Sequence, residues 1–533
     1  MKKIWLILAL AAFLRLFLLG SVPASLNWDE ISMGVSANSI MQTGMDEWGE
    51  KLPIFFRSYG EWKSAVYIYL LVPFIKVLGL NAWAVRLPSA LAGILAVYLT
   101  YLIGKKLYSD KVGLWASFLL AVSPWHLMLS RPAFEANVSL TLILAGIYFF
   151  LRFSLKSNIY FLISSAIALG LAPHTYNSAK VVVPLLALYL IFSTKLYKHL
   201  KQLALFLGIL ALFAAPILLN LVSGRAQYRY SQVGVTTDQK GLTEFIDNRR
   251  TFPLPALANK FVFNRATYFV YKTARNYLSY FDPSFLALEA GDHNQHHLKF
   301  FGVLYKTEFV LVLLGLYLLL SRKLTPLTGL PLILISLGFL PASMTRDSHH
   351  VLRSILTLPG WQLLAGLGLS HLQTTKSKFL TPIIFLLVSE AIIFILLYFT
   401  WYPKAFARDW QSGYSEVAAY LKTHESEYDR IVMTKWYGEP QLFLAFYNRW
   451  DPTWFQTENH QNLRYETEGK IWLDQLPEYY LGKYTFKYLN WQDEDKSPRT
   501  LFIGKWDDFY PDSHIVKTVS FPDGSPAFLL VEP

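Results

Sequence analysis

Hydrophobic positions occur in long runs separated by short polar segments, and this alternation predicts a bundle of membrane helices. Twelve runs are long and apolar enough to be helices of a polytopic membrane protein. They cover residues 4–20, 65–80, 87–104, 112–130, 137–151, 159–173, 179–193, 202–222, 300–320, 326–342, 354–371 and 379–401. No run of this kind follows residue 402.

Clusters of basic residues indicate which runs cross the membrane, because short cytoplasmic connections are rich in Lys and Arg. The clusters contain Lys2, Lys3, Lys105, Lys106, Lys111, Arg152, Lys156, Lys195, Lys198, Lys201, Arg322, Lys323, Lys376 and Lys378. With both the N-terminus and 105–111 inside, only one of the runs 65–80 and 87–104 can cross after the first. The run 65–80 contains Pro73 and Lys76, so we expect it to lie in the outer interface. The pattern predicts about eleven transmembrane helices, with a cytoplasmic N-terminus.

The segments predicted to face outward are 21–86, 130–136, 174–178, 223–299 and 342–353, followed by the whole tail. The segment 223–299 is much longer than an ordinary loop and holds Arg249-Arg250 and a His-rich stretch from Asp292 to His297. Loops of this length are uncommon and often functional, so we expect it to cover a substrate.

The tail from residue 403 to 533 is polar and rich in Trp and Tyr. Apolar spacing predicts a helix at 415–423, and short apolar segments at 429–434, 499–503 and 527–531 predict strands. We therefore expect two domains: a transmembrane catalytic domain, 1–402, and a soluble extracytoplasmic α/β domain, 403–533.

Composition narrows the functional class. Hydrophobic residues make up 53% of the 533 residues and charged residues only 16%, which is typical of a polytopic membrane protein. The net charge of +12 comes from the clusters between apolar runs, so no nucleic-acid partner is expected. The absence of cysteine excludes disulfide, zinc-thiolate and thiol redox chemistry.

The candidate chemistry lies in the outward segments, where charge close to a membrane is costly and often functional. Asp29 and Glu30 follow the first apolar run, and Lys63 returns a cation to the same segment. The other unusual polar residues of the outer side are Arg131, Glu135, His174, Tyr176, Arg346, His349, His350 and Arg353. Singly, each is explained equally well as an interfacial anchor, but together they indicate a site for proton removal and anion binding.

A metal is a further possibility that the sequence leaves open. Asp29, Glu30 and Glu135 offer oxygen ligands for a hard divalent cation, so a divalent cation is retained as an optional cofactor. His349 and His350 are adjacent, and neighbouring residues of an extended segment point to opposite faces, which disfavours a shared ion.

Several short motifs resemble one superfamily. The pair Asp29-Glu30 is similar to the acidic motif of the GT-C glycosyltransferases, and the segment 61–67 (EWKSAVY) resembles the lysine motif of one branch. That branch contains the protein O-mannosyltransferases of glycosyltransferase family 39 and the lipid A aminoarabinose transferase. Ser64 and Ala65 stand where the branch has prolines. The segment 78–88 (LGLNAWAVRLP), Ser130-Arg131 with Glu135, and 350–359 resemble later motifs, so the resemblance extends over residues 1 to about 400.

The resemblance implies a GT-C-like fold and an inverting transferase that moves a sugar from a polyprenyl-phosphate donor to a protein, lipid or glycan acceptor. It implies catalytic roles for Asp29, Glu30 and Glu135. Phosphate or donor binding falls to Lys63, Arg131, Arg346 and Arg353, with substrate contacts from His174, Tyr176, His349 and His350. The expected setting is the outer face of a prokaryotic plasma membrane, among membrane lipids and in the synthesis of the cell envelope.

Two other functional classes compete with this interpretation. A transporter or flippase of a lipid-linked or anionic substrate needs polar residues inside its spans. Here Arg15 and Glu390 are the main charged interruptions, which disfavours a transport path. A membrane-anchored receptor or assembly factor would use the tail and leave the clustered outer charges without a role.

Overall fold

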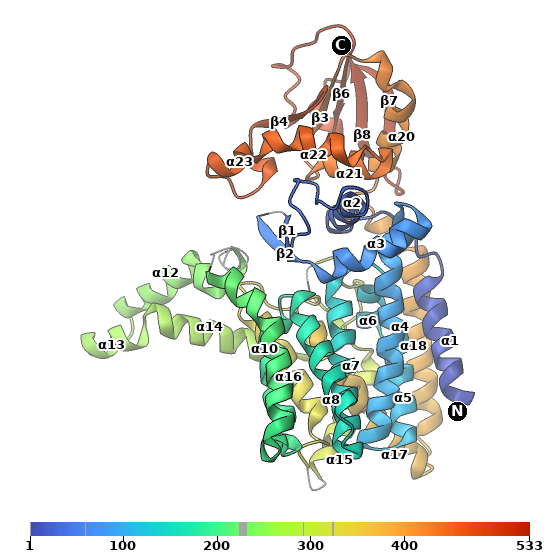
Figure 1. Cartoon of the computed structure of the whole chain (residues 1–533), viewed down its shortest axis with the longest axis vertical. Helices are drawn as coiled ribbons and strands as arrows, with labels where there is room; N and C mark the ends of the chain where they lie inside the picture. The colour runs from blue at the N-terminus through green and yellow to red at the C-terminus, as the bar shows by residue number, and fades with distance from the viewer. Residues whose placement is uncertain (1, 59, 223–231, 292, 322–324) are drawn as a thin grey trace. The chain divides into compact units, whose positions relative to one another are not determined.

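The computed structural model describes residues 2–58, 60–222, 232–291, 293–321 and 325–533 (Figure 1). Contacts divide the chain into two compact units. The first contains residues up to 15 together with 91–130 and 135–394, and the second contains 16–90, 131–134 and 395–533. Asp292, Arg322 and Lys323, which take part in the sequence predictions, lie outside the described residues.

The first unit is helical. Its helices are α1 (Lys2–Leu16), α4 (Ala82–Leu107), α5 (Asp110–Val122), α6 (Pro124–Ser130), α7 (Glu135–Lys156), α8 (Ile159–Leu171), α9 (Ala179–Ser193), α10 (Leu200–Val222), α12 (Gln239–Asp247), α13 (Ala256–Val262), α14 (Arg265–Ser279), α15 (Lys306–Leu320), α16 (Leu330–Ser343), α17 (Gly360–Thr374) and α18 (Leu380–Thr400). The ends of α1, α4 and α18 continue into the second unit. The long apolar helices lie side by side as a bundle, and α12, α13 and α14 project from it (Figure 1).

Every predicted apolar run coincides with a helix or a pair of helices. Within the described residues, four helices are long and apolar enough to cross a membrane, namely α4, α7, α10 and α18, and the bent pair α5–α6 makes up to five. Several others are short: α8 has 13 residues and α16 has 14, so at 1.5 Å per residue neither alone reaches across about 30 Å of hydrocarbon. The helical class is confirmed, whereas the count of eleven crossings stays a prediction.

Arg15, one of the two charged interruptions, binds backbone carbonyls at a break in the bundle. Helices α5 and α6 meet at a bend of 59°, where Pro124 has no N–H to donate to the carbonyl of Leu120. The buried Arg15 guanidinium donates to the carbonyls of Leu120 at 3.2 Å and Ala121 at 2.9 Å, and its Nη2 lies 2.8 Å from His126 Nδ1. A cation in an apolar run therefore replaces the hydrogen bonds that the bend removes.

Glu390, the other interruption, has a similar role at the start of α15. Its Oε2 accepts from the backbone N–H of Thr307 at 3.1 Å, in the helical turn whose amides have no intrahelical partner. The buried Glu308 in the same turn accepts from Gln362 Nε2 at 2.9 Å. Both charged interruptions of the apolar runs thus form hydrogen bonds with backbone groups that have no partner within their own helix. Because this explains their presence, it weakens the transport interpretation.

The second unit begins with a helix where the sequence indicated only a polar segment. Helix α2 (Trp28–Thr43) starts at a capping box: the Asn27 side chain accepts from the Glu30 N–H at 2.9 Å, and the Glu30 carboxylate accepts from the Asn27 N–H at 3.1 Å. It ends at Gly44, whose φ of 74° is a left-handed conformation that suits glycine. The hairpin β1 (Phe55–Ser58) and β2 (Glu61–Ser64) and then α3 (Val66–Leu78) follow. The predicted run 65–80 is therefore helical, and its interfacial position stays a prediction.

The tail forms the predicted α/β structure. Its strands are β3 (Arg430–Thr434), β4 (Glu478–Leu481), β5 (Tyr484–Lys487), β6 (Thr500–Gly504), β7 (His514–Ser520) and β8 (Pro526–Glu532), in the order β4-β5-β3-β6-β8-β7. Strand β3 pairs in parallel with β5 and β6, and the other pairs are antiparallel. The helices are α19 (Tyr402–Ala405), α20 (Tyr414–His424), α21 (Pro440–Asn448), α22 (Pro452–His460) and α23 (Arg464–Thr467).

All three predicted strands and the predicted helix of the tail exist, as β3, β6, β8 and α20. These strands are central and almost wholly buried, so their apolar runs are clear in the sequence. Strands β4, β5 and β7 were missed because they are shorter or carry a polar outer face. The predicted domain border at residue 402 follows chain order, whereas contacts group the tail with residues 16–90.

Candidate active site

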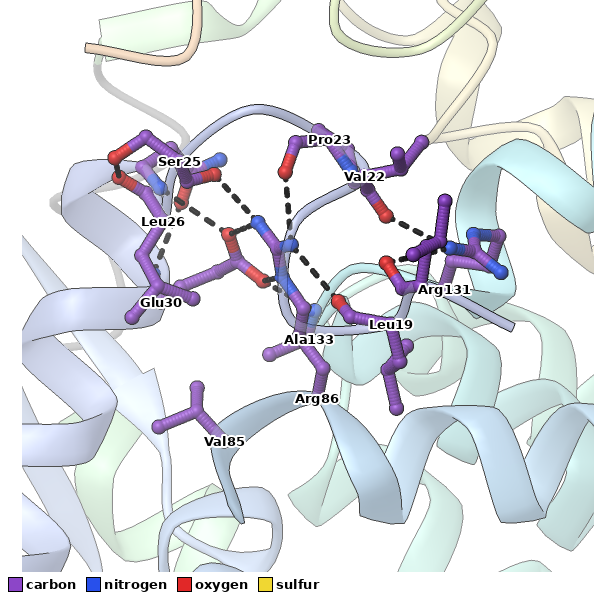
Figure 2. A network of polar contacts seen from close by, with 12 residues as sticks. Leu19, Val22, Pro23, Ser25, Leu26, Glu30, Val85, Arg86, Arg131 and Ala133 are labelled. Carbon is purple, nitrogen blue, oxygen red and sulfur yellow. Dashed lines mark hydrogen bonds and ion pairs between the residues drawn. The ribbon is translucent and has the colours of Figure 1, made fainter. Parts of the chain in front are cut away.

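The start of α2 is fixed by a buried ion pair between Glu30 and Arg86 (Figure 2). Both side chains have no solvent exposure, and the guanidinium meets the carboxylate at two points, Nε to Oε1 at 2.8 Å and Nη2 to Oε2 at 3.0 Å. Such a two-point contact matches the planar fork of arginine to the planar carboxylate. The pair links α2 to the N-terminal turn of α4.

The remaining bonding capacity of this pair is also used. Glu30 accepts from the backbone N–H of Ala133 at 2.9 Å and from Asn27. Arg86 donates to the backbone carbonyls of Leu19 and Pro23, each at 3.1 Å, and to that of Ser25. Four acceptor positions on the carboxylate and five N–H groups on the guanidinium are thereby engaged. Glu30, predicted as catalytic, has a structural role in this conformation, and Arg86 is a key residue that the sequence interpretation did not select.

Arg131, predicted to bind phosphate, is also engaged within the second unit. Its fully buried guanidinium donates through Nη2 to the carbonyls of Val22 at 2.9 Å and Leu18 at 3.2 Å (Figure 2). It lies 4.7 Å from the ring centroid of Phe399, a cation–π arrangement. Arg131 therefore fastens the 18–22 segment, and we do not retain it as a phosphate ligand in this conformation.

Asp29 and Lys63 form an ion pair in the second unit whose aspartate is accessible to solvent. Lys63 Nζ lies 2.5 Å from Asp29 Oδ1, with side-chain exposures of 8% for the lysine and 37% for the aspartate. Successive residues of a helix point about 100° apart, so Asp29 faces away from the buried Glu30. Asp29 stands in the first turn of α2, where the helix dipole stabilises negative charge. The structure thus brings together one predicted acid and one predicted cation in a half-exposed position.

The other predicted residues belong to the first unit. Glu135 is the first residue of α7 and is partly buried, so its charge also meets a helix N-terminus. His174 is buried, with Nε2 2.6 Å from the carbonyl of Phe213, and Tyr176 is buried nearby in the chain. The Ser178 hydroxyl donates to the carbonyl of Arg353 at 3.4 Å, which brings the 174–178 and 342–353 segments together.

Arg353 is the more enclosed of the two late arginines. Its Nη1 donates to Thr345 Oγ1 at 3.0 Å and lies 3.9 Å from Asp347 Oδ2. Arg346, by contrast, is exposed and donates to the carbonyl of Gln232. The enclosed position of Arg353 makes it the better candidate for holding an anion within the first unit.

The two adjacent histidines point to different neighbours, as expected for consecutive residues. His349 stacks on Phe285 at 5.0 Å between centroids, and its Nε2 lies 2.9 Å from the carbonyl of Ser279. The His350 ring lies 4.7 Å from that of His293 and 5.3 Å from that of His296. Despite this gathering of imidazoles, the described residues contain no group of three His, Cys, Asp or Glu side chains arranged to hold a metal ion.

Comparisons with known proteins bear on the family and the fold. Residues 63–219 match the model of a protein family described as dolichyl-phosphate-mannose-protein mannosyltransferase. The fold resembles that of ArnT from Cupriavidus metallidurans, both in the apo state and bound to undecaprenyl phosphate. For each structure the TM-score is 0.55 at 12% identity, over 99% of this chain and 97% of that chain. No curated protein matches the sequence.

The chain is thus similar to the protein mannosyltransferase family over residues 63–219, and its overall fold resembles the fold of ArnT. A weaker likeness, with a TM-score of 0.45 at 14% identity, is to the oligosaccharyltransferase AglB from Archaeoglobus fulgidus, over 84% of this chain and 63% of that chain. The family match and the fold of ArnT confirm the resemblance that the short motifs indicated. The matched family segment begins at Lys63 and includes Arg86, Arg131 and Glu135.

The chain carries further acids close to Lys63 that the sequence did not single out. Burial raises the pKa of Glu47 to about 8, assisted by the negative charge of Asp46, while Lys63 opposes the shift. Burial and the charge of Asp474 raise the pKa of Glu439 well above its usual range, and Lys63 and Asp29 are among the charges that act on it. Both shifts favour the protonated form of these glutamates. Asp29 is in direct contact with Lys63.

We predict that Glu30→Gln destabilises the protein by about 3–5 kcal/mol, because it leaves the Arg86 charge buried without its counter-ion. Glu466→Gln is the matched control: Glu466 pairs with Arg57 at 2.9 Å but is 47% exposed, so its loss should cost only about 0–1 kcal/mol. Thermal unfolding of the two variants in detergent measures the difference. Equal shifts in melting temperature would contradict the assigned role of the buried pair.

The raised pKa of Glu47 predicts a pH-dependent stability. The folded chain keeps a proton that the unfolded carboxyl releases above its ordinary pKa of 4.5, so the free energy of unfolding falls as the pH rises through about 8. Glu47→Gln, which is permanently neutral, should make the melting temperature fall less steeply between about pH 5 and about pH 9. Glu50→Gln serves as the control for removing a nearby acid. A slope unchanged in Glu47→Gln would show that this group does not titrate as expected.

Proposed function

We propose that this chain is an inverting glycosyltransferase that moves a sugar from a polyprenyl phosphate to a hydroxyl acceptor at the outer membrane surface. The observation that carries the proposal is the Asp29–Lys63 pair, a half-exposed base at a helix start in contact with an enclosed cation. The relationship to GT-C glycosyltransferases supports the class of reaction, and the complex of ArnT with undecaprenyl phosphate supports the kind of carrier.

The proposed reaction uses Asp29 as the general base. Its carboxylate takes the proton of the acceptor hydroxyl while the oxygen attacks the anomeric carbon of the sugar. The bond from that carbon to the phosphate oxygen breaks, and the carrier phosphate leaves with the bonding electrons. Attack from the face opposite the phosphate inverts the anomeric configuration.

Lys63 supplies positive charge for the departing phosphate. In the free protein its ammonium contacts Asp29, so an arriving phosphate competes for the same cation. When phosphate takes the ammonium, Asp29 loses its ionic partner and becomes available to accept a proton. Carrier binding and activation of the base are coupled in this way.

The remaining candidates belong to the first unit, and the motif resemblance supports their roles. Arg353 is the preferred additional anion ligand, because it is enclosed and held by Thr345. Glu135, at the start of α7, is the preferred assisting acid. Arg346 is a weaker candidate for donor binding, and substrate contacts are assigned to His174, Tyr176, His349 and His350. The sidedness in this proposal follows the basic clusters, with a cytoplasmic N-terminus and an extracytoplasmic tail.

We predict that Asp29→Asn lowers turnover by about 10²–10⁴-fold, because it removes a general base and preserves the side-chain shape. Mass spectrometry of envelope proteins and glycolipids, with and without the chain, identifies the product and provides the assay. The purified variant should keep the melting temperature of the wild type within a small margin. It should bind undecaprenyl phosphate at least as tightly as the wild type, because the carboxylate that competes for Lys63 is gone. Wild-type turnover in Asp29→Asn would rule out this base, and a parallel Glu135→Gln variant would show whether that acid replaces it.

We predict that Lys63→Ala weakens binding of undecaprenyl phosphate by about 10- to 100-fold, since a charge-assisted hydrogen bond contributes about 1.5–3 kcal/mol. Lys76→Ala, in the last turn of α3 and exposed, is the matched loss of one positive charge and should leave the affinity unchanged. Titration of detergent-solubilised protein with undecaprenyl phosphate measures both. Equal affinities of the two variants would remove Lys63 from the phosphate site.

A further inference from the structure

The tail of the second unit contacts the helix that carries Asp29 at its very first residue. Trp28 is the first residue of α2, and its backbone N–H is one of the amides that a helix start leaves without an intrahelical partner. The Oε1 of Gln411 accepts from this N–H at 2.7 Å. Gln411 lies in the tail, 383 residues away in the chain, and is 9% exposed.

The same glutamine is itself held by the tail. Its Nε2 donates to the backbone carbonyl of Tyr437, in the loop that follows strand β3. Because one end of the amide must accept and the other must donate, the two bonds fix its orientation. The Gln411 side chain is therefore a rigid bridge between this loop and the start of α2.

Gly438, next in the same loop, meets the Trp28 side chain. Its φ of +84° is left-handed, and a Cβ at this position would lie 2.6 Å from Cε3 of the indole. Only glycine lets the loop approach the ring so closely without displacement. The residue immediately before Asp29 is thus held through both its backbone and its side chain.

The tail also contacts the other end of α2, which provides an internal control. Gln456 of α22 donates through Nε2 to Ser39 Oγ at 2.8 Å, to Thr43 Oγ1 at 2.9 Å and to the carbonyl of Asp46 at 2.9 Å. Gln411 and Gln456 are chemically identical clamps on one helix. They differ in the part of the helix that they bind. Gln411 binds Trp28, the residue before Asp29, whereas Gln456 binds Ser39 and Thr43 in the last turns.

The loop that makes these contacts lies at the carboxyl end of a strand, where α/β sheets commonly bind ligands. It follows the C-terminal end of β3, which lies between two parallel neighbours in the sheet. In this chain, residues of that loop contact the start of α2. The carboxyl of Glu439, the next residue, is 8% exposed and lies within electrostatic range of Lys63 and Asp29.

We propose that Gln411 and Gly438 are positioning residues, through which the tail fixes Asp29 for proton removal. The tail then takes part in the reaction by orienting the base and touches neither donor nor acceptor. The inference rests on the proposed function, because it assumes that Asp29 is the base. A displacement of about 1 Å in a reacting group can cost about 10²-fold in rate, so loss of one anchor should be visible in turnover.

Gln411→Met and Gln456→Met, made in the full-length chain, test the proposal. Each keeps the approximate side-chain volume and removes the hydrogen bonds. Gln411→Met should lower kcat by about 10- to 100-fold and leave KM for the polyprenyl-phosphate donor within about twofold, because Lys63 is untouched. Gln456→Met should retain kcat, although it loses more hydrogen bonds and a comparable amount of thermal stability.

Hydrogen–deuterium exchange gives a readout independent of activity. Peptides covering residues 27–31 should exchange faster in Gln411→Met and at the wild-type rate in Gln456→Met. Unchanged exchange at 27–31 in Gln411→Met overturns the anchoring, as does a fall in kcat that simply follows melting temperature in both variants. Wild-type kcat in Gln411→Met beside an inactive Asp29→Asn removes the positioning role alone, whereas an active Asp29→Asn removes the proposed base and this inference together.

Discussion

The contact on which the second unit depends is the ion pair between Glu30 and Arg86. Two charges withdrawn from water cost several kcal/mol each unless every donor and acceptor is engaged. Here the guanidinium reaches three backbone carbonyls besides Glu30, and the carboxylate reaches the N–H groups of Asn27 and Ala133. Segments from three parts of the chain must therefore occupy fixed positions around one charge pair, and the start of α2 is defined by that requirement.

Adjacent acids in one motif consequently have different tasks. Glu30 is buried and fully bonded, which makes it a rigid support. Asp29, one residue earlier and about 100° around the helix, is 37% exposed and touches an ammonium that a phosphate can also bind. A catalytic base needs both a fixed position and access to its substrate. In the proposed mechanism Glu30 provides the fixed position and Asp29 has the access.

The tail also supports helix α2. The contacts of Gln411, Gly438 and Gln456 hold both ends of α2, so the α/β domain belongs to the structural unit that contains the candidate base. Burial raises the pKa values of the nearby acids Glu47 and Glu439, which favours their neutral forms. The ammonium of Lys63 contacts Asp29 in the free protein.

Long apolar runs by themselves predicted the helical membrane class and the central strands of the tail. A membrane helix can be apolar all round, as 202–222 is, and a strand buried on both faces is apolar throughout, as 527–531 is. Short motifs also identified Asp29 and Lys63 as candidate site residues, because each lies in a short segment that resembles a GT-C motif. The roles of Glu30, Arg131 and Arg15 were decided only by tertiary structure, because a charged side chain looks the same in sequence whether it binds phosphate or buried carbonyls. Gln411 had no local signal at all: its partner at Trp28 lies 383 residues away, and only folding brings the two into contact.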